Sequence, residues 1–245
     1  MLDLVGVVLC GTSNPGNIGA SARAMKNMGL RRLCLVGSQL SKEDSVELAR
    51  SSHACDVLEQ ALSFGSLSDA VAQSSCVLGL TSRLRKRNSV VSLSLPDAIG
   101  MVLPLIRQGK YVSFVFGSEK TGLTNEQLMS CSRAVYILAS DEYPSLNLAA
   151  AVQVVCYELR RQLLLGNDKT DATEQRCCPA TAQEFFHLMD HLNRVLEKIR
   201  FCNRLSASTM SKFRRIYSKA NLEKEEVALL RGLLSQVEYC LSESE

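Results

Sequence analysis

Three short segments of this 245-residue sequence carry the residue types best suited to chemistry. They are residues 11–19, 116–123 and 141–155, and each follows an apolar run that predicts a buried strand. Glycines in the first two segments let the backbone approach a ligand, and free N–H groups at the start of a helix can bind phosphate. Ligands of open parallel sheets bind at the carboxyl ends of the strands. We therefore expect these segments to form a binding site.

These segments and the predicted helix after the first contain four side chains of interest, each with two interpretations. Arg23 lies one turn beyond Gly19 and points away from the apolar face of the predicted helix, which also fits an ordinary surface arginine. Glu119 is either a functional carboxylate between two glycines or a surface charge in a plain strand–turn–helix connection. Ser145 is placed to cap a helix, and Asn147 within that helix needs a hydrogen-bond partner. Spacing alone leaves these alternatives open.

Strands and helices alternate in the first two thirds of the chain. Apolar runs predict strands at residues 4–10, 33–36, 76–80, 112–116 and 135–138. Helices are predicted at 17–28, near Glu43, and at 66–74, 97–107, 124–131 and 146–164. Gly29 is suited to end the first helix, and Thr124 with Gln127 has the capping-box pattern. Since each strand is a continuous apolar run, we predict an α/β fold whose parallel sheet has helices on both faces.

The pattern changes after residue 165. Residues 166–179 are polar and lack periodicity, and we interpret them as a linker between an α/β domain at 1–165 and a small α-helical extension at 180–245. Within the extension, apolar residues recur at helical spacing in 185–199 and 223–241. The extension is therefore expected to contain amphipathic helices and no strands.

Composition argues against several classes of protein. No apolar run reaches the roughly eighteen residues that span a membrane, and the acidic N-terminus does not resemble a signal peptide, so we expect a cytoplasmic protein. The ten cysteines form no C-x-x-C pair, which favours free thiols packed as small apolar groups. His187 and His191 have helical spacing but no evident third ligand, so we expect no metal site.

Basic residues are concentrated in two places, although the formal net charge is only +3. Residues 194–219 contain eight Lys and Arg side chains and one acid, Glu197. The other cluster consists of Arg83, Arg85, Lys86 and Arg87. This sorting favours a polyanionic ligand on particular faces, although a solvated helix face would have the same pattern.

Three segments together resemble a known family. Residues 14–29, 116–123 and 145–152 are similar, in order and spacing, to the three motifs of the SPOUT methyltransferases of the TrmH/TrmJ branch. Residues 212–220 and 229–234 resemble the helical C-terminal extension of the TrmJ enzymes. The resemblance spans essentially the whole chain. It implies a trefoil knot in the C-terminal part of the sheet and a homodimer, in which the apolar helix that starts at residue 146 would face the partner.

The resemblance also implies a cofactor, S-adenosylmethionine, bound in the knot against the ends of several strands. The residues implied are Thr81, Ser82, Arg83, Gly117, Ile137, Pro144, Ser145, Leu146 and Asn147. Pro144 departs from the family pattern, where a small polar residue is frequent, and should stiffen the approach to Ser145.

The implied reaction is 2′-O-methylation of a ribose in tRNA, at the first nucleotide of the anticodon loop, on cytidine, uridine or both. Chemistry on a 2′-hydroxyl implies RNA rather than DNA. The implied catalytic residues are Arg23, Asn14, Glu119, Ser145 and Asn147. Since a guanidinium stays protonated, we expect Arg23 to stabilise the developing oxyanion and anchor a phosphate, with a role as base left open. RNA contacts are expected from Arg23, Arg85, Arg87, Arg204, Lys212, Arg214 and Arg215.

Three alternatives compete with this function. The same chemistry could act on ribosomal RNA, but the C-terminal extension favours tRNA. A non-catalytic RNA-binding protein that retains the knot is disfavoured by the presence of Arg23, Glu119, Ser145 and Asn147. A dinucleotide-dependent oxidoreductase is disfavoured because no G-x-G-x-x-G follows the first strand and no suitable acid ends the second.

Overall fold

The computed structural model describes residues 1–37, 54–82, 91–165, 179–199, 201, 207–220 and 222–242. Several predictions fall outside these residues. They are the helix near Glu43, the basic cluster with Arg83, Arg85 and Arg87, the side chain of Arg204, and nearly all of the linker at 166–179.

Seven parallel strands form a single sheet in the described part of the chain. The strands are β1 (Val5–Cys10), β2 (Arg32–Val36), β3 (Leu62–Phe64), β4 (Cys76–Leu80), β5 (Ser92–Ser94), β6 (Val112–Phe116) and β7 (Arg133–Tyr136). Their order is β3-β2-β1-β6-β4-β7-β5. From β1 the chain adds β2 and then β3 on one side of the sheet. The later strands lie on the other side of β1, so the strand order reverses between β1 and β6. Such a switch point is where open parallel sheets bind ligands.

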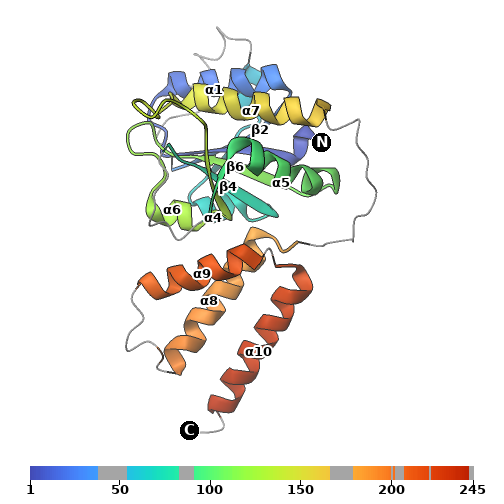
Figure 1. The fold of residues 1–245 in the computed structure, drawn as a ribbon, viewed down its shortest axis with the longest axis vertical. Coiled ribbons are helices and arrows are strands. Elements are labelled where there is room, and N and C mark those ends of the chain that lie inside the picture. Colours follow the sequence, from blue (N-terminus) through green and yellow to red (C-terminus); the bar gives the residue numbers. More distant parts are fainter. Residues whose placement is uncertain are drawn as a thin grey trace.

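Helices cover both faces of the sheet, as predicted (Figure 1). One face is covered by α1 (Pro15–Met28), α3 (Cys55–Glu59), α5 (Leu95–Arg107) and α7 (Leu148–Leu165), and the other by α4 (Leu67–Val71) and α6 (Asn125–Met129). Each face has its own buried cluster, so the sheet is apolar on both sides. A 3-10 turn, Leu2–Leu4, precedes β1.

The helix ends follow the local sequence closely. Asn14 caps α1 through its side chain, Pro15 occupies the first turn, and Gly29 ends the helix in the left-handed conformation with φ of 83°. Thr124 and Gln127 form the predicted capping box of α6. The short elements β3, β5 and α3 were not predicted, and β7 begins two residues before the predicted 135–138. Elements of three to five residues are too short to produce a periodic signal.

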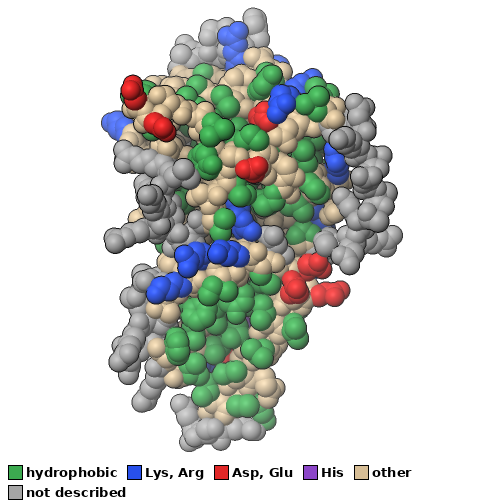
Figure 2. Space-filling model, in the orientation of Figure 1, with side chains coloured by type: hydrophobic (Ala, Val, Ile, Leu, Met, Phe, Trp, Pro, Cys, Tyr) green, Lys and Arg blue, Asp and Glu red, His purple; other side chains and the backbone are tan. Residues whose placement is uncertain are grey.

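The C-terminal extension consists of three helices, α8 (Ala182–Lys198), α9 (Ala207–Ala220) and α10 (Lys224–Ser242). They lie beside the α/β domain in Figure 1 and share a core of their own. This confirms that the extension is helical. Figure 2 shows a broad hydrophobic area on its surface, below a row of Lys and Arg side chains over α9. Among the described segments, none of the helices combines the length and apolar character needed to cross a bilayer.

The first turn of α8 attaches the extension to the α/β domain. Two backbone N–H groups at the start of α8 donate to the carbonyls after α4, from Ala182 to Ser74 at 2.7 Å and from Gln183 to Ala72 at 3.3 Å. Ala182 and Phe186 also pack against the buried cluster beneath α4 and α6. The extension therefore contributes apolar side chains to the core of the α/β domain. The exact domain boundaries stay a prediction.

Helix α7 is buried on one side in the single chain. The buried side comprises Leu148, Val152, Val155, Cys156 and Leu159. Val154, Tyr157 and Leu164 are exposed in the single chain. The trefoil knot that the resemblance implies also stays a prediction.

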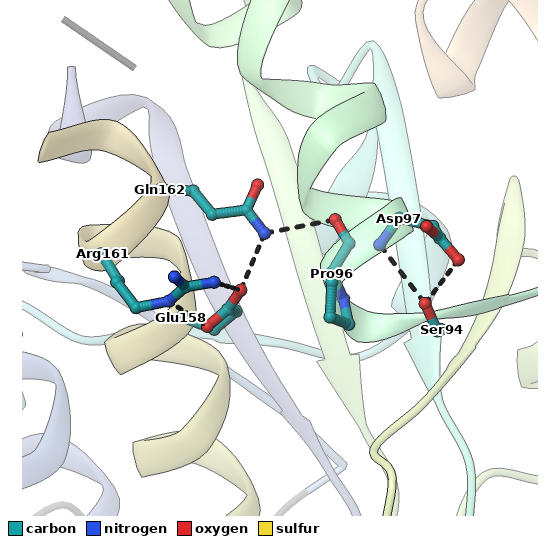
Figure 3. Close-up of polar contacts among 6 residues, drawn as sticks. All are labelled: Ser94, Pro96, Asp97, Glu158, Arg161 and Gln162. Carbon is teal, nitrogen blue, oxygen red and sulfur yellow. Dashed lines mark hydrogen bonds and ion pairs between the residues drawn. The ribbon is translucent and has the colours of Figure 1, made fainter. Parts of the chain in front are cut away.

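A hydrogen bond joins α7 to α5, and further polar contacts lie within α7 and at the start of α5 (Figure 3). Gln162 donates to the Pro96 carbonyl at 3.3 Å and to Glu158 at 2.8 Å, and Arg161 makes a two-pronged contact with the same carboxylate at 2.6 and 2.7 Å. Ser94 caps α5 by accepting from the backbone N–H of Asp97. The position of α7 is therefore defined by polar contacts as well as by its buried side.

Candidate active site

The three segments singled out in the sequence meet at the carboxyl ends of the strands. The side chain of Asn17, at the start of α1, connects them. Its Nδ2 donates to Glu119 Oε1 at 3.0 Å, and its Oδ1 accepts from Asn147 Nδ2 at 3.2 Å. The backbone N–H of Ser13 lies 3.4 Å from Glu119 Oε2. Residues about a hundred positions apart in the chain thus share one hydrogen-bond network.

Glu119 is held in its ionised form. Partial burial acts to raise its pKa, but hydrogen bonds from the Asn17 side chain and from nearby backbone N–H groups outweigh burial, so the pKa lies below its usual value. A carboxylate that stays ionised at neutral pH accepts hydrogen bonds and cannot donate a proton. Glu119 is thus suited to hold the first two segments together.

The segment after β6 is a closed loop. Gly122 donates its N–H to the Ser118 carbonyl at 2.9 Å, and the Ser118 and Thr121 hydroxyls lie 2.8 Å apart. Gly117 packs directly on this turn, because a Cβ at that position would lie 2.0 Å from the Gly122 carbonyl carbon. Glycine is therefore required at 117 for the loop to close upon itself.

A cavity of about 640 Å³ opens beside these segments. Seven of the nine residues expected to contact a cofactor line it: Thr81, Ser82, Gly117, Ile137, Pro144, Ser145 and Leu146. Asn147 is outside the lining and bonds to Asn17, while Arg83 lies outside the described residues. The ends of β4, β6 and β7 thus contribute to one cavity, whose volume is typical of small-molecule sites.

The capping role expected for Ser145 belongs to Asn147. Asn147 Oδ1 accepts from the N–H groups of Ala149 at 3.0 Å and Ala150 at 3.4 Å, and α7 begins at Leu148, later than the predicted residue 146. The prediction failed because both residues are good helix caps and the helix begins two residues later than predicted. Ser145 is consequently left exposed at the cavity.

Arg23 and Asn14 both belong to the first motif but have different surroundings. Asn14 Oδ1 accepts from the Gly16 N–H at 2.8 Å and so fixes the start of α1. Arg23 is exposed on the side of α1 opposite the buried Ile18 and Met25, as its spacing predicted. It is outside the lining of the cavity. The central role of Asn17 was not predicted from the sequence, because nothing in its spacing shows that its side chain joins all three segments.

The basic residues of the extension divide into two groups. Lys212, Arg215 and Lys219 are exposed on α9, spaced three and four residues apart, so they share one face of a helix that contains no acid. Arg214 is partly buried, and its Nη1 lies 3.5 Å from the Met129 carbonyl at the end of α6. Burial lowers the pKa of Arg214, while Asp190 and Glu126 nearby act to raise it.

Both parts of the chain match models of known families. Residues 5–157 match the SpoU rRNA Methylase family, and residues 183–245 match the C-terminal domain of the tRNA methyltransferase TrmJ. Together the two matches cover the α/β domain and the helical extension.

Individual relatives match over the full length. The tRNA (cytidine/uridine/adenosine-2′-O-)-methyltransferase TrmJ of Pseudomonas aeruginosa is 39% identical over 246 residues, which cover 97% of this chain and 95% of the relative. The crystal structure of TrmJ from Z. mobilis ZM4 has a TM-score of 0.79 at 26% identity, with 95% of this chain and 98% of that chain covered. A structure concerned with the 2-OH methylation of C/U34 on tRNA matches less of the chain, with a TM-score of 0.50, 26% identity, and 65% of this chain and 96% of that chain covered.

Proposed function

The chain belongs to the SpoU methylase family, and we propose that it methylates the 2′-oxygen of a ribose in tRNA with S-adenosylmethionine as methyl donor. The observation that carries this proposal is the hydrogen-bond network of Asn17, Glu119 and Asn147, which joins the first segment to the two segments that line the cavity. The match of the extension to the TrmJ C-terminal domain supports tRNA as the substrate.

A structure of the SpoU methyltransferase AviRb from Streptomyces viridochromogenes contains S-adenosylmethionine as cofactor, and the cavity described above is suited to such a ligand. Its lining combines apolar side chains, Leu80, Ile137 and Leu146, with backbone groups at strand ends. Apolar walls with a few convergent polar groups are typical of cofactor sites. When bound, S-adenosylmethionine supplies an electrophilic methyl group.

The protein's own task is to orient the ribose and favour loss of its hydroxyl proton. A ribose hydroxyl is a weak acid, so a cation near the oxygen stabilises the charge that develops there. Arg23 is exposed and permanently charged, which suits it to this task and to holding the adjacent phosphate. Glu119 and Asn147 act indirectly, because they fix Asn17 and hence the start of the helix that carries Arg23. Ser145, exposed at the cavity, is placed to hydrogen-bond near the reacting groups.

The exposed face of α9 is proposed as the tRNA-binding surface of the extension. Lys212, Arg215 and Lys219 present three cations without a competing acid on the same helix. The proposed target is the first nucleotide of the anticodon loop. The alternative position is nucleotide 34, whose methylation is the subject of one of the similar structures. Mapping of the methylated position separates the two. A tRNA substrate also implies that the protein works in the cytoplasm.

We further infer a homodimer in which the exposed side of α7 faces the partner. Val154, Tyr157 and Leu164 lie on that side, 37%, 55% and 62% exposed in the single chain. Covering large apolar side chains of this kind is favourable. Analytical ultracentrifugation should give twice the chain mass, and a monomer with full activity would contradict this inference.

The test of the proposed function is to map methyl groups on RNA treated with the protein and radiolabelled S-adenosylmethionine. Unmodified tRNA should acquire label on a ribose of the anticodon loop, and ribosomal RNA should not. The family model is described for rRNA methylases, so labelled ribosomal RNA with unlabelled tRNA would support the second candidate, an rRNA 2′-O-methyltransferase. Transfer to neither RNA, despite cofactor binding, would contradict both.

A further inference from the structure

Two arginines join the extension to the segment between the loops of the proposed site. Residues 129–133 run from the end of α6 to the start of β7. On one side, α6 follows the closed loop that carries Gly117 and Glu119. On the other side, β7 leads to Ile137 and Ser145 in the cavity lining. A contact that fixes residues 129–133 therefore also restrains the chain on either side of them, which leads to two segments that line the cavity.

The first arginine, Arg133, belongs to this segment and reaches α9. It is 6% exposed, and its Nη1 donates to the Ser132 carbonyl at 2.7 Å and to the Ser218 carbonyl at 2.6 Å. Ser218 lies in the last turn of α9, where carbonyls lack partners within the helix. A guanidinium at this position satisfies such a carbonyl and interacts favourably with the negative end of the helix.

The second arginine, Arg214, belongs to α9 and contacts the α/β domain. Its Nη1 lies 3.5 Å from the carbonyl of Met129, the last residue of α6, and the Ser211 hydroxyl lies 3.1 Å from Met129 Sδ. The two helices are therefore joined reciprocally. An arginine from the α/β domain meets the end of α9, and an arginine from α9 meets the end of α6.

Neither arginine is well placed to bind RNA, in contrast to their neighbours. Arg133 is buried, and Arg214 is partly buried, while Lys212, Arg215 and Lys219 are exposed on α9. The residues between α6 and β7 are also anchored to the sheet. The Ser132 N–H donates to the Val77 carbonyl of β4 at 2.7 Å, and the Val77 N–H donates to the Ser132 hydroxyl at 3.1 Å. The segment therefore links the position of α9 to the end of α6 and to the starts of β4 and β7.

We propose that Arg133 and Arg214 are positioning residues, which lock the cationic face of α9 in a fixed geometry relative to the cofactor cavity so that tRNA held on α9 presents its ribose correctly. This rests on the proposed function. Loss of either arginine should leave tRNA affinity nearly unchanged and slow the methyl-transfer step. A misplacement of about 1 Å can reduce a rate by up to roughly a hundredfold, so we expect a loss on the order of tenfold.

The test compares R133M, R214M and R133K with R215M, which removes an exposed cation from the same helix. Dissociation constants for tRNA and S-adenosylmethionine are measured, together with the single-turnover rate at saturating tRNA. R133M and R214M should slow the rate on the order of tenfold with both dissociation constants nearly unchanged, and R133K should recover part of it. R215M should raise the dissociation constant for tRNA, so it shows what loss of a tRNA contact alone produces. Unchanged saturated rates in both R133M and R214M would overturn the proposal.

Hydrogen exchange separates this proposal from the proposed function. Backbone amides of residues 117–131 should exchange faster in R214M than in the wild-type protein, and at the wild-type rate in R215M. If the wild-type protein methylates no tRNA, the proposed function fails, and exchange still decides whether the arginines hold the segment. Equal exchange in R214M and wild type would then overturn the positioning role. R214M also covers the case in which R133M does not fold, because Arg214 is less buried.

Discussion

The α/β domain and the helical extension use opposite means to hold their functional side chains. In the α/β domain, the candidate site lies on a sheet with a buried cluster on each face, and its segments are joined by short hydrogen bonds among Asn17, Glu119 and Asn147. In the extension, the core is small, apolar side chains such as Leu229 are 75% exposed, and the basic residues extend into solvent from one helix. The first arrangement fixes the positions of individual atoms, whereas the second presents charged side chains to solvent on one face of a helix.

The largest difference should come from Arg23 in the α/β domain. Arg23→Ala removes the cation proposed to stabilise the developing oxyanion, and methyl transfer should fall by roughly a hundredfold or more, on the order expected for such groups. Cofactor binding should persist, because Arg23 does not line the cavity. Arg31→Ala is a matched control, since this exposed arginine precedes β2 at the opposite end of the sheet. An active Arg23→Ala protein would remove the catalytic role from this residue.

Gly117 tests whether the α/β site is as closely fixed as its contacts indicate. In Gly117→Ala, the new Cβ would lie 2.0 Å from the Gly122 carbonyl carbon and 2.1 Å from the Leu123 nitrogen. Backbone atoms cannot rotate away, so the loop must open, with a cost of about 1–3 kcal/mol or more in stability. Calorimetry should show a lower unfolding temperature and weaker S-adenosylmethionine binding.

Gly100→Ala is the matched control for the Gly117 variant. A Cβ at this position in α5 meets no atom within 4 Å, and alanine favours a helix by about 0.5–1 kcal/mol over glycine. The unfolding temperature should therefore stay the same or rise. If both alanine variants bind the cofactor as the wild-type protein does, the loop after β6 is more adaptable than its geometry indicates.

In the extension, the loss of basic side chains should weaken tRNA binding in steps rather than abolish it. Removing the charges of Lys212 and Arg215 together should weaken tRNA binding and reduce the slope of log affinity against log salt, by about one for each phosphate that the protein no longer neutralises. Filter binding at several salt concentrations measures both quantities, with Arg31→Ala as a control of equal charge type. An unchanged salt slope would show that α9 does not bind phosphates.

Sequence reasoning succeeded where the chemistry is local and repeated. Continuous apolar runs predicted the parallel sheet, and caps such as Thr124 and Gly29 predicted helix ends within a few residues. Seven of the nine expected cofactor residues line one cavity, because loops after parallel strands meet at one edge of the sheet. The resemblance supplied the rest of the function, including the cofactor and the RNA substrate.

What could not be predicted depends on contacts between distant segments. The link from Asn17 to both Glu119 and Asn147 joins residues more than a hundred positions apart, which no local pattern encodes. The sequence likewise grouped Arg214 with the exposed cations of its helix, although the fold turns it toward Met129.

The smallest expected effect concerns two glutamates, one in each region, whose pKa values are lowered by different causes. The Glu238 carboxylate in the extension has its pKa lowered chiefly by the hydrogen bond from Lys198, at 2.9 Å, and by His191. Glu119 has its pKa lowered by uncharged donors, against the opposing effect of burial. Both lowered pKa values mean a stabilising contribution that is complete above the ordinary pKa of 4.5 and disappears as the pH falls through the lower folded value.

Salt should affect these two groups differently, because it screens an exposed ion pair and leaves hydrogen bonds from neutral groups nearly unchanged. In an acid titration followed by the carboxyl carbon resonances, high salt should raise the pKa of Glu238 toward its ordinary value and leave that of Glu119 in place. Lys198→Met should raise the pKa of Glu238 at low salt and reduce its salt dependence, because only the contact with His191 remains. A salt-dependent pKa at Glu119 would mean that an ionic contact, rather than the Asn17 amide, holds the two site segments together.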